Sequence, residues 1–140
     1  MRVLFCCEHN TGRSQMAEAF FNRGARERGI DASAESAGCH AAGIMNPFVV
    51  VAMEEVGICM DEHRPKSLTL EMAERAEWIV AMGEDVQFET CPIEVTVNER
   101  WDLADPAGKP VDVIRKIAAE CRSRVEAMLL TLPSKKASLR

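Results

Sequence analysis

The chain has 140 residues, of which 47% are hydrophobic and 28% charged, and a formal net charge of −5. This length suits one domain with a substantial core, and the acidic balance argues against general nucleic-acid binding, which needs a basic face. No stretch is long and apolar enough to span a membrane, and the N-terminus lacks the features of a signal peptide. We therefore predict a cytoplasmic monomer, in which the six cysteines are free rather than joined in disulfides.

The first predicted unit is a strand, a loop and a helix. An apolar run at residues 3–6 predicts a buried strand, and a helix is expected to begin near Ser14. Cys7 and Arg13 bracket the polar loop between them. Backbone N–H groups of such a loop, together with the positive end of the helix dipole, can bind a tetrahedral anion, and an arginine can hold two of its oxygens. The predicted oxyanion-binding residues are Glu8, His9, Asn10, Thr11, Gly12, Arg13 and Ser14.

Cys7 is the predicted nucleophile of this loop, because a thiolate is stabilised by the same positive field. Cys6 is assigned to the core, since neighbouring side chains of a strand point to opposite sides; the alternative is that both are buried, inert thiols. Asn10 tolerates a left-handed conformation, and Gly12 allows close backbone approach. Ser14 can donate a hydrogen bond to the thiolate.

The following segments alternate between helix and strand. The first helix is predicted at 14–28 and ends at Gly29, and Glu18, one turn after Ser14, either braces the loop or faces solvent. A strand is predicted at 32–37. The next helix begins at Asn46-Pro47 and ends before Gly57. Most of its apolar residues are expected in the core, including Phe48, Val49, Val51 and Ala52.

The second half continues this alternation. Residues 61–67 read as a loop in which His63 is a surface histidine, and Thr69 is expected to cap a short helix to Arg75. Strands are predicted at 78–82 and 93–97, and a loop at 101–108. Pro110 opens the last helix, which ends at Pro133 and is followed by a polar tail over 133–140. Its apolar residues recur at helical spacing and predict a core stripe of Val113, Ile117, Cys121, Val125, Met128 and Leu132.

Alternating strands and helices predict a single α/β domain over 1–140 with a parallel sheet. Residues 3–20 resemble the opening of the low-molecular-weight protein tyrosine phosphatase superfamily. Residues 13–18, Arg-Ser-Gln-Met-Ala-Glu, resemble its thiol-dependent arsenate reductase branch, because the phosphatases usually have Pro in place of Gln15. Similar motifs continue at 36–38, 46–47, 64–67 and 105–108. The resemblance implies a three-layer sandwich around a four-stranded parallel sheet of order 2-1-3-4, with helices on both faces.

The resemblance also implies roles for residues outside the loop. Asp105, before Pro106, corresponds to the general acid of the family, and the Ser36 hydroxyl to the group that holds Asn10. Arsenate reduction would then proceed by attack of Cys7 on arsenate, followed by attack of a second thiol on the Cys7 sulfur. Thioredoxin-coupled relatives keep two further cysteines for this step. Cys91 corresponds to the second of them, whereas Glu84 stands in the place of the first.

Three routes for the second thiol therefore stay open. Cys91 can attack Cys7 directly, a small thiol with a glutaredoxin-like partner can attack instead, or Cys39 can substitute. Cys39 and Cys59 otherwise read as ordinary, semi-buried thiols, and Cys121 as structural. We expect no tightly bound cofactor or metal, an arsenate or phosphate oxyanion as substrate, and thioredoxin or glutaredoxin as the external reductant.

Other functions use the same loop. The main alternative is a phosphatase that hydrolyses phosphotyrosine or small aryl phosphates through a phosphocysteine. Ala107 and Gly108 stand where such phosphatases usually place aromatic residues, and the chain contains no tyrosine. A phosphocarrier domain would not need Arg13, and a non-catalytic oxyanion sensor would not need the full set of Cys7, Arg13 and Asp105.

Overall fold

The computed structural model describes residues 1–86 and 88–133. The residues 134–140 of the predicted polar tail lie outside the described residues. Within the described part, strands and helices alternate for most of the chain, as expected. In chain order the elements are β1 (Arg2–Cys7), α1 (Arg13–Glu27), β2 (Ser33–Gly38), α2 (Pro47–Glu55), α3 (Leu70–Arg75), β3 (Trp78–Met82), the 3₁₀ helix η1 (Phe88–Thr90), β4 (Glu99–Trp101) and α4 (Val111–Leu130).

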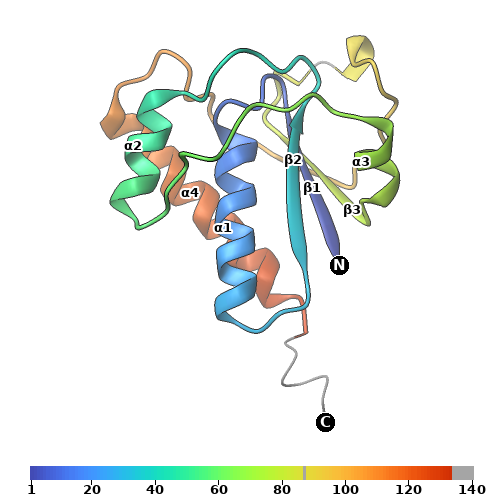
Figure 1. The fold of residues 1–140 in the computed structure, drawn as a ribbon, viewed down its shortest axis with the longest axis horizontal. Helices are drawn as coiled ribbons and strands as arrows, with labels where there is room; N and C mark the ends of the chain where they lie inside the picture. The colour runs from blue at the N-terminus through green and yellow to red at the C-terminus, as the bar shows by residue number, and fades with distance from the viewer. Residues whose placement is uncertain (87, 134–140) are drawn as a thin grey trace.

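The four strands form one parallel sheet in the order β2-β1-β3-β4. This confirms the predicted architecture and strand order. β1 lies in the interior of the sheet, where Cys7 pairs with Gly38 of β2 and Cys6 with Ala81 of β3. Because all strands are parallel, the loops after them meet at one edge, the upper end of the molecule in Figure 1, opposite the N-terminus.

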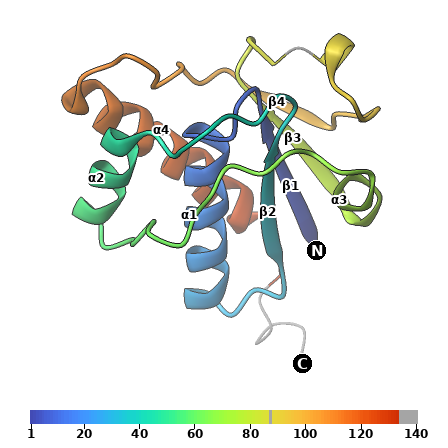
Figure 2. The same cartoon turned by 45° about the horizontal axis from the view of Figure 1, so that its top comes forward.

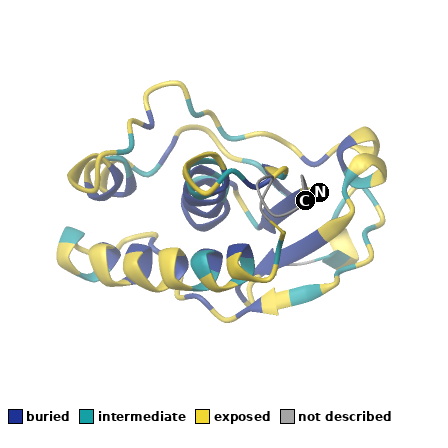
Figure 3. Ribbon diagram, turned by 90° about the horizontal axis from the view of Figure 1, so that it is seen from below, coloured by how far each residue is buried: buried dark blue, intermediate teal, exposed yellow. Residues whose placement is uncertain are grey.

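Helices cover both faces of this sheet. α1 and α4 pack together on one face and α2 packs against α4, whereas α3 lies on the other face next to β1; Figures 1 and 2 show these layers. In Figure 3 the buried residues gather where helices face the sheet and one another. In the described part of the chain, no helix has the length and apolarity needed to cross a bilayer.

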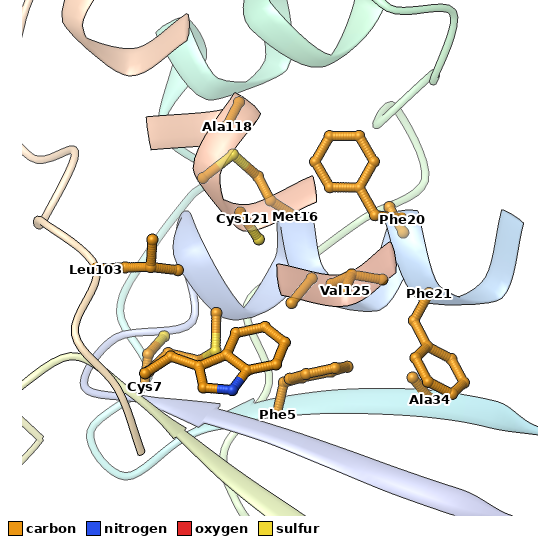
Figure 4. Packing of buried hydrophobic residues seen from close by; sticks show 14 of the residues in the cluster. Phe5, Cys7, Met16, Phe20, Phe21, Ala34, Leu103, Ala118, Cys121 and Val125 are labelled. Carbon is orange, nitrogen blue, oxygen red and sulfur yellow. The ribbon is translucent and has the colours of Figure 1, made fainter. Parts of the chain in front are cut away.

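Apolar side chains divide into two buried clusters, one on each face of the sheet. The larger lies between the sheet, α1 and α4, and Figure 4 shows Phe5 and Phe21 from β1 and α1 beside Cys121 and Val125 from α4. The smaller lies under α3 and contains Leu4, Cys6, Ala37, Leu68, Met72 and Ile79. The alternation predicted for β1 therefore places Cys6 and Cys7 on opposite faces.

The position of the last strand was predicted wrongly. Residues 93–97 form no strand, and β4 is instead Glu99–Trp101, which ends at the first residue of the segment predicted as loop. The apolar alternation that suggested a strand has another cause. Ile93 and Val95 are partly buried and pack against the smaller cluster from an extended loop, without ladder partners. Trp101 is buried, and its ring centroid lies 5.5 Å from that of Phe5 with the ring planes tilted by 52°.

The helices begin and end close to the predicted positions, but the residues that they bury differ in part from those predicted. Asn46 caps α2, and its side chain accepts hydrogen bonds from Phe48 and Val49 N–H groups. Val49 and Ala52 are buried as expected, but Phe48 and Val51 are exposed, because α2 packs with one side only. In α4 the stripe also includes three buried residues that were not predicted, Ile114, Ala118 and Leu129. The predicted Val113, Met128 and Leu132 are only partly buried.

Candidate active site

The loop between β1 and α1 surrounds the sulfur of Cys7. The Asn10 backbone N–H donates to Cys7 Sγ at 3.1 Å, and the Ser14 hydroxyl lies 2.8 Å from the same sulfur. Cys7 is 3% exposed. α1 begins at Arg13 and has no acidic residue in its first turn, so the positive end of its dipole is directed at the loop without a neutralising charge. Cys7 is thus held where an anion-binding loop meets a helix N-terminus.

Asn10 organises the loop. Its backbone has the expected left-handed conformation, with φ of 59°. Its side-chain amide donates to Ser14 Oγ at 2.7 Å and to Ser36 Oγ at 3.0 Å. Ser36 in turn donates to Glu18 at 3.2 Å. The predicted contact of Ser36 with Asn10 is therefore present, and Glu18 braces the loop rather than facing solvent alone.

Arg13 is buried and has two partners that fix its guanidinium. Nη1 donates to the Leu103 carbonyl at 3.1 Å, and Nη2 donates to Asp85 Oδ2 at 2.8 Å. Burial alone would lower the pKa of Arg13, but the hydrogen bond and charge of Asp85 outweigh it and raise that pKa. The hydrogen bond from Arg13 also lowers the pKa of Asp85. The sequence alone provided no reason to single out Asp85.

Asp105 lies over the same loop. Its Oδ1 is 3.9 Å from Arg13 Nη2 and accepts the Ala107 N–H at 3.0 Å, and its side chain is 48% exposed. Pro106 packs so closely on Gly12 that a Cβ at Gly12 would lie 2.7 Å from the proline ring. The predicted nucleophile and arginine, at the two ends of the loop after β1, are therefore brought together with the predicted acid from the loop after β4.

Asn46 joins these segments from the start of α2. Its backbone N–H donates to the Thr11 carbonyl at 3.0 Å, and its side-chain amide donates to the Pro106 carbonyl at 3.4 Å. Thr11 belongs to the loop between β1 and α1, and Pro106 belongs to the loop after β4 that carries Asp105. The cap of α2 consequently holds the loop of the predicted nucleophile next to the loop of the predicted acid.

Gln15 supports the loop from beneath, a role that the sequence did not suggest. It is fully buried, and its amide donates to Asn10 Oδ1 and to the Arg64 carbonyl, both at 2.8 Å. His63 Nδ1 lies 2.8 Å from Gln15 Oε1, and Glu18 lies close by at 3.5 Å from the same nitrogen. His63 is thus half-buried beneath the loop instead of a surface histidine, and burial lowers its pKa.

Two other loop residues are directed toward His40, which follows β2. His9 Nδ1 lies 2.9 Å from the His40 carbonyl, and the Glu8 carboxylate pairs with His40 Nδ1. His40 Nε2 lies 3.0 Å from the Thr90 carbonyl. These contacts join the loop between β1 and α1 to the last residue of η1, which directly precedes Cys91.

The remaining cysteines have different environments. Burial, followed by the nearby Cys7 and Cys91, raises the pKa of Cys6 to about 12, and burial raises the pKa of Cys121 to about 12, as suits a structural thiol. Cys59 is exposed and Cys39 is buried, so neither is semi-buried as expected. Cys91 is half-buried and packs against both clusters, the larger of which includes Cys7 and Cys39. No group of three or more His, Cys, Asp or Glu in residues 1–86 and 88–133 could hold a metal ion.

Similarity to known proteins extends over nearly the whole chain. Residues 2–138 match the family model described as low molecular weight phosphotyrosine protein phosphatase. An arsenate reductase of Staphylococcus epidermidis is 31% identical over 127 residues, which are 89% of this chain and 93% of that protein. The structure of a low molecular weight protein tyrosine phosphatase from T. tengcongensis has a TM-score of 0.82 and 32% identity, covering 94% of this chain and 99% of the other.

A third relative is named for its reductant. The thioredoxin-dependent arsenate reductase of Corynebacterium glutamicum has a TM-score of 0.70 and 29% identity, covering 93% of this chain but only 60% of that chain. Arsenate reductases and phosphatases both occur among these relatives. The chain belongs to the low molecular weight phosphotyrosine protein phosphatase family.

Proposed function

We propose that this protein is an arsenate reductase that converts arsenate to arsenite. The Cys7 sulfur attacks the arsenic atom of an arsenate bound by the loop N–H groups and Arg13. Asp105 donates a proton to the departing oxygen, which leaves as water, because a bare oxide is a poor leaving group. The product is an adduct in which the Cys7 sulfur is bonded to arsenic(V). The close approach of Asp105 to Arg13, at 3.9 Å, supports these roles.

Reduction requires a second thiol, and Cys91 is the proposed one. Its thiolate attacks the Cys7 sulfur, the sulfur–arsenic bond breaks, and its electron pair stays on arsenic, which leaves as arsenite. Two thiols thereby become one disulfide, and arsenic gains two electrons. The observation that carries this proposal is that Cys91 packs against the cluster containing Cys7. An external dithiol, for which thioredoxin is the leading candidate, then reduces the disulfide.

Phosphomonoester hydrolysis is the second candidate, because the similar T. tengcongensis structure is a phosphatase. Cys7, Arg13 and Asp105 would keep their roles, and water would resolve a phosphocysteine. Ala107 and Gly108 directly follow Pro106 and are both exposed, so they provide no aromatic wall for a phosphotyrosine ring. The lack of aromatic side chains at these two positions favours a small oxyanion as the substrate.

The test is arsenate-dependent NADPH oxidation with thioredoxin and thioredoxin reductase. Wild type is compared with Cys7→Ser and Cys91→Ser, and Cys59→Ser, at an exposed site, is the matched control. A parallel reaction contains glutaredoxin and a small thiol, and a third contains an aryl phosphate without a reductant. We expect activity with thioredoxin that both site variants lose and the control keeps.

Other results would change the proposal in defined ways. Activity only with the small thiol, lost in Cys7→Ser but not in Cys91→Ser, would remove Cys91 from the reaction. Hydrolysis of the aryl phosphate without arsenate reduction by any donor would overturn the reductase and support the phosphatase.

A further inference from the structure

A second pair of thiols lies beside the candidate site. The Cys39 N–H donates to the Cys7 carbonyl at 3.1 Å, so Cys39 follows β2 directly next to the nucleophile's backbone. The side chain of Cys39 is 3% exposed, and the neighbouring Cys91 thiol contributes to the raised pKa of Cys39. Both side chains pack into the larger apolar cluster. Two cysteines far apart in the sequence thus meet at the edge of the sheet that carries Cys7.

Neighbouring residues hold this pair together. His40 follows Cys39, and its Nε2 lies 3.0 Å from the carbonyl and 3.3 Å from the hydroxyl of Thr90, which precedes Cys91. The Cys91 N–H donates to the Phe88 carbonyl at 3.2 Å. Both backbone segments are therefore fixed beside each other, independently of any bond between the sulfurs.

The two thiols are not equivalent. Burial and then the neighbouring Cys91 thiol raise the pKa of Cys39. A thiol with a raised pKa is a poorer nucleophile near neutral pH, because less of it is thiolate. Cys39 is also buried, whereas Cys91 is half-buried and more accessible. This assigns the first attack to Cys91 and leaves Cys39 as the thiol that reacts later.

We propose that Cys39 is the partner of Cys91 and that a Cys39–Cys91 disulfide is the end product of each turnover. This inference rests on the proposed arsenate reduction, which generates the Cys7–Cys91 disulfide. Cys39 loses its proton to water and attacks the Cys91 sulfur, the Cys7–Cys91 bond breaks, and Cys7 leaves as a thiolate. No net electrons are consumed in this exchange. An external dithiol then reduces the Cys39–Cys91 disulfide and is itself oxidised.

The environment of the other candidates supports this choice. Glu84 is an exposed carboxylate and cannot take part in thiol exchange. Cys6 lies near Cys91 but is fully buried in the smaller cluster, and burial raises its pKa to about 12. Exchange from Cys91 to Cys39 would return Cys7 to its thiolate form inside the intact oxyanion loop, ready for the next arsenate.

The experiment is a single turnover of the reduced full-length protein with arsenate and no reductant. Arsenite is measured directly, and free thiols are alkylated before digestion with trypsin and a glutamate-specific protease. The glutamates between Cys39 and Cys59 allow these two cysteines to be separated. We expect about one arsenite per protein, a Cys39–Cys91 cross-link and an alkylated Cys7 peptide.

Variants test the order of the two disulfides. Cys39→Ser should still release arsenite in the single turnover but stop at the Cys7–Cys91 cross-link. Its steady-state rate with thioredoxin should fall by about tenfold, because the disulfide then remains on the catalytic sulfur. Cys39→Ala should behave in the same way, and a thermal melt of both variants verifies the fold. Cys59→Ser, the exposed control, should match wild type.

Two results would overturn the role of Cys39, and a third would show instead that the proposed arsenate reduction is wrong. Arsenite release from wild type with Cys7–Cys91 as the final cross-link would show that Cys39 takes no part. A wild-type rate in both folded Cys39 variants would show the same. If wild type releases no arsenite, the proposed function itself fails and the inference falls with it.

Discussion

The guanidinium of Arg13 is held by a carboxylate from a distant part of the chain, since its Nη2 donates to Asp85 Oδ2 at 2.8 Å. Asp85 lies after β3, at the sheet edge where parallel α/β sheets bind ligands. Asp105 lies 3.9 Å from the same nitrogen. An entering oxyanion therefore meets an arginine that two carboxylates already orient, and Asp85 makes the closer contact.

Asp85→Ala should weaken oxyanion binding. Without the charge-assisted bond, Arg13 is less firmly oriented, and we expect about a tenfold rise in KM for arsenate with a smaller change in kcat. Asp85 is 40% exposed, so solvent screening limits the effect. Inhibition by phosphate should weaken in parallel, and Glu84→Ala is the control at the exposed neighbouring carboxylate. Tighter phosphate binding would contradict this role and identify Asp85 as a competitor for Arg13.

Gly83→Ala should displace Arg13 directly. Gly83 has φ of +96°, and a Cβ there would lie 1.9 Å from Arg13 Nη1. We expect a loss of stability of about 2 kcal/mol or more, from the strained backbone and the clash, together with loss of arsenate turnover. Urea unfolding and steady-state kinetics measure the two effects.

The matched control for this change is Gly29→Ala. Gly29 also has a positive φ, of +62°, but nothing lies within 4 Å of the added Cβ. Gly29→Ala should lose only about 1 kcal/mol of stability, from the unfavourable backbone conformation, and should keep full activity. Equal activity losses in the two variants would mean that the clash with Arg13 is unimportant.

The sequence predicted the loop between β1 and α1 well, because the residues that form this loop are neighbours in the sequence. The strand, the Cys7-to-Arg13 spacing and the helix start are all encoded within one short segment, and the structure contains them. Asp85 was missed because its role exists only through contact with Arg13, 72 positions away in the sequence. Gln15 was missed for the same reason, since its partner Arg64 lies 49 positions further along the chain.

The misplaced strand has a similar explanation. Residues 93–97 alternate because Ile93 and Val95 pack on a buried cluster, and a packed extended loop has the same period as a strand. Only backbone hydrogen bonding to a neighbouring strand distinguishes a strand from such a loop. β4, at Glu99–Trp101, has this pairing with β3. The contact between Cys39 and Cys91 likewise depends on how this loop folds back, and not on any spacing between the two cysteines.

Asp105→Asn should slow the chemical step. If Asp105 protonates the leaving oxygen, its loss should lower kcat for arsenate by about 10²-fold or more and change KM little. Asp102→Asn, at an exposed aspartate of the same loop, is the control and should remain near wild type. Rapid-quench measurement of arsenite in a single turnover reports the step directly. A large KM effect with unchanged kcat would instead assign Asp105 to binding.

The stability of the protein should depend on His63 in mildly acidic solution. Burial lowers the pKa of His63, nearby Glu18 opposes this shift, and Lys66 adds to it. A folded-state pKa below the unfolded value of about 6.5 means that the unfolded chain binds the proton more readily. The free energy of unfolding therefore decreases as pH falls below about 6.5, and His63 causes no such decrease above that value.

His63→Asn, which keeps a polar group near Gln15, should reduce the loss of unfolding free energy between pH 7.5 and pH 5. Urea unfolding at both pH values measures this difference, and His9→Asn, at an exposed histidine, is the control. Identical pH dependence in wild type and His63→Asn would show that another group carries the effect.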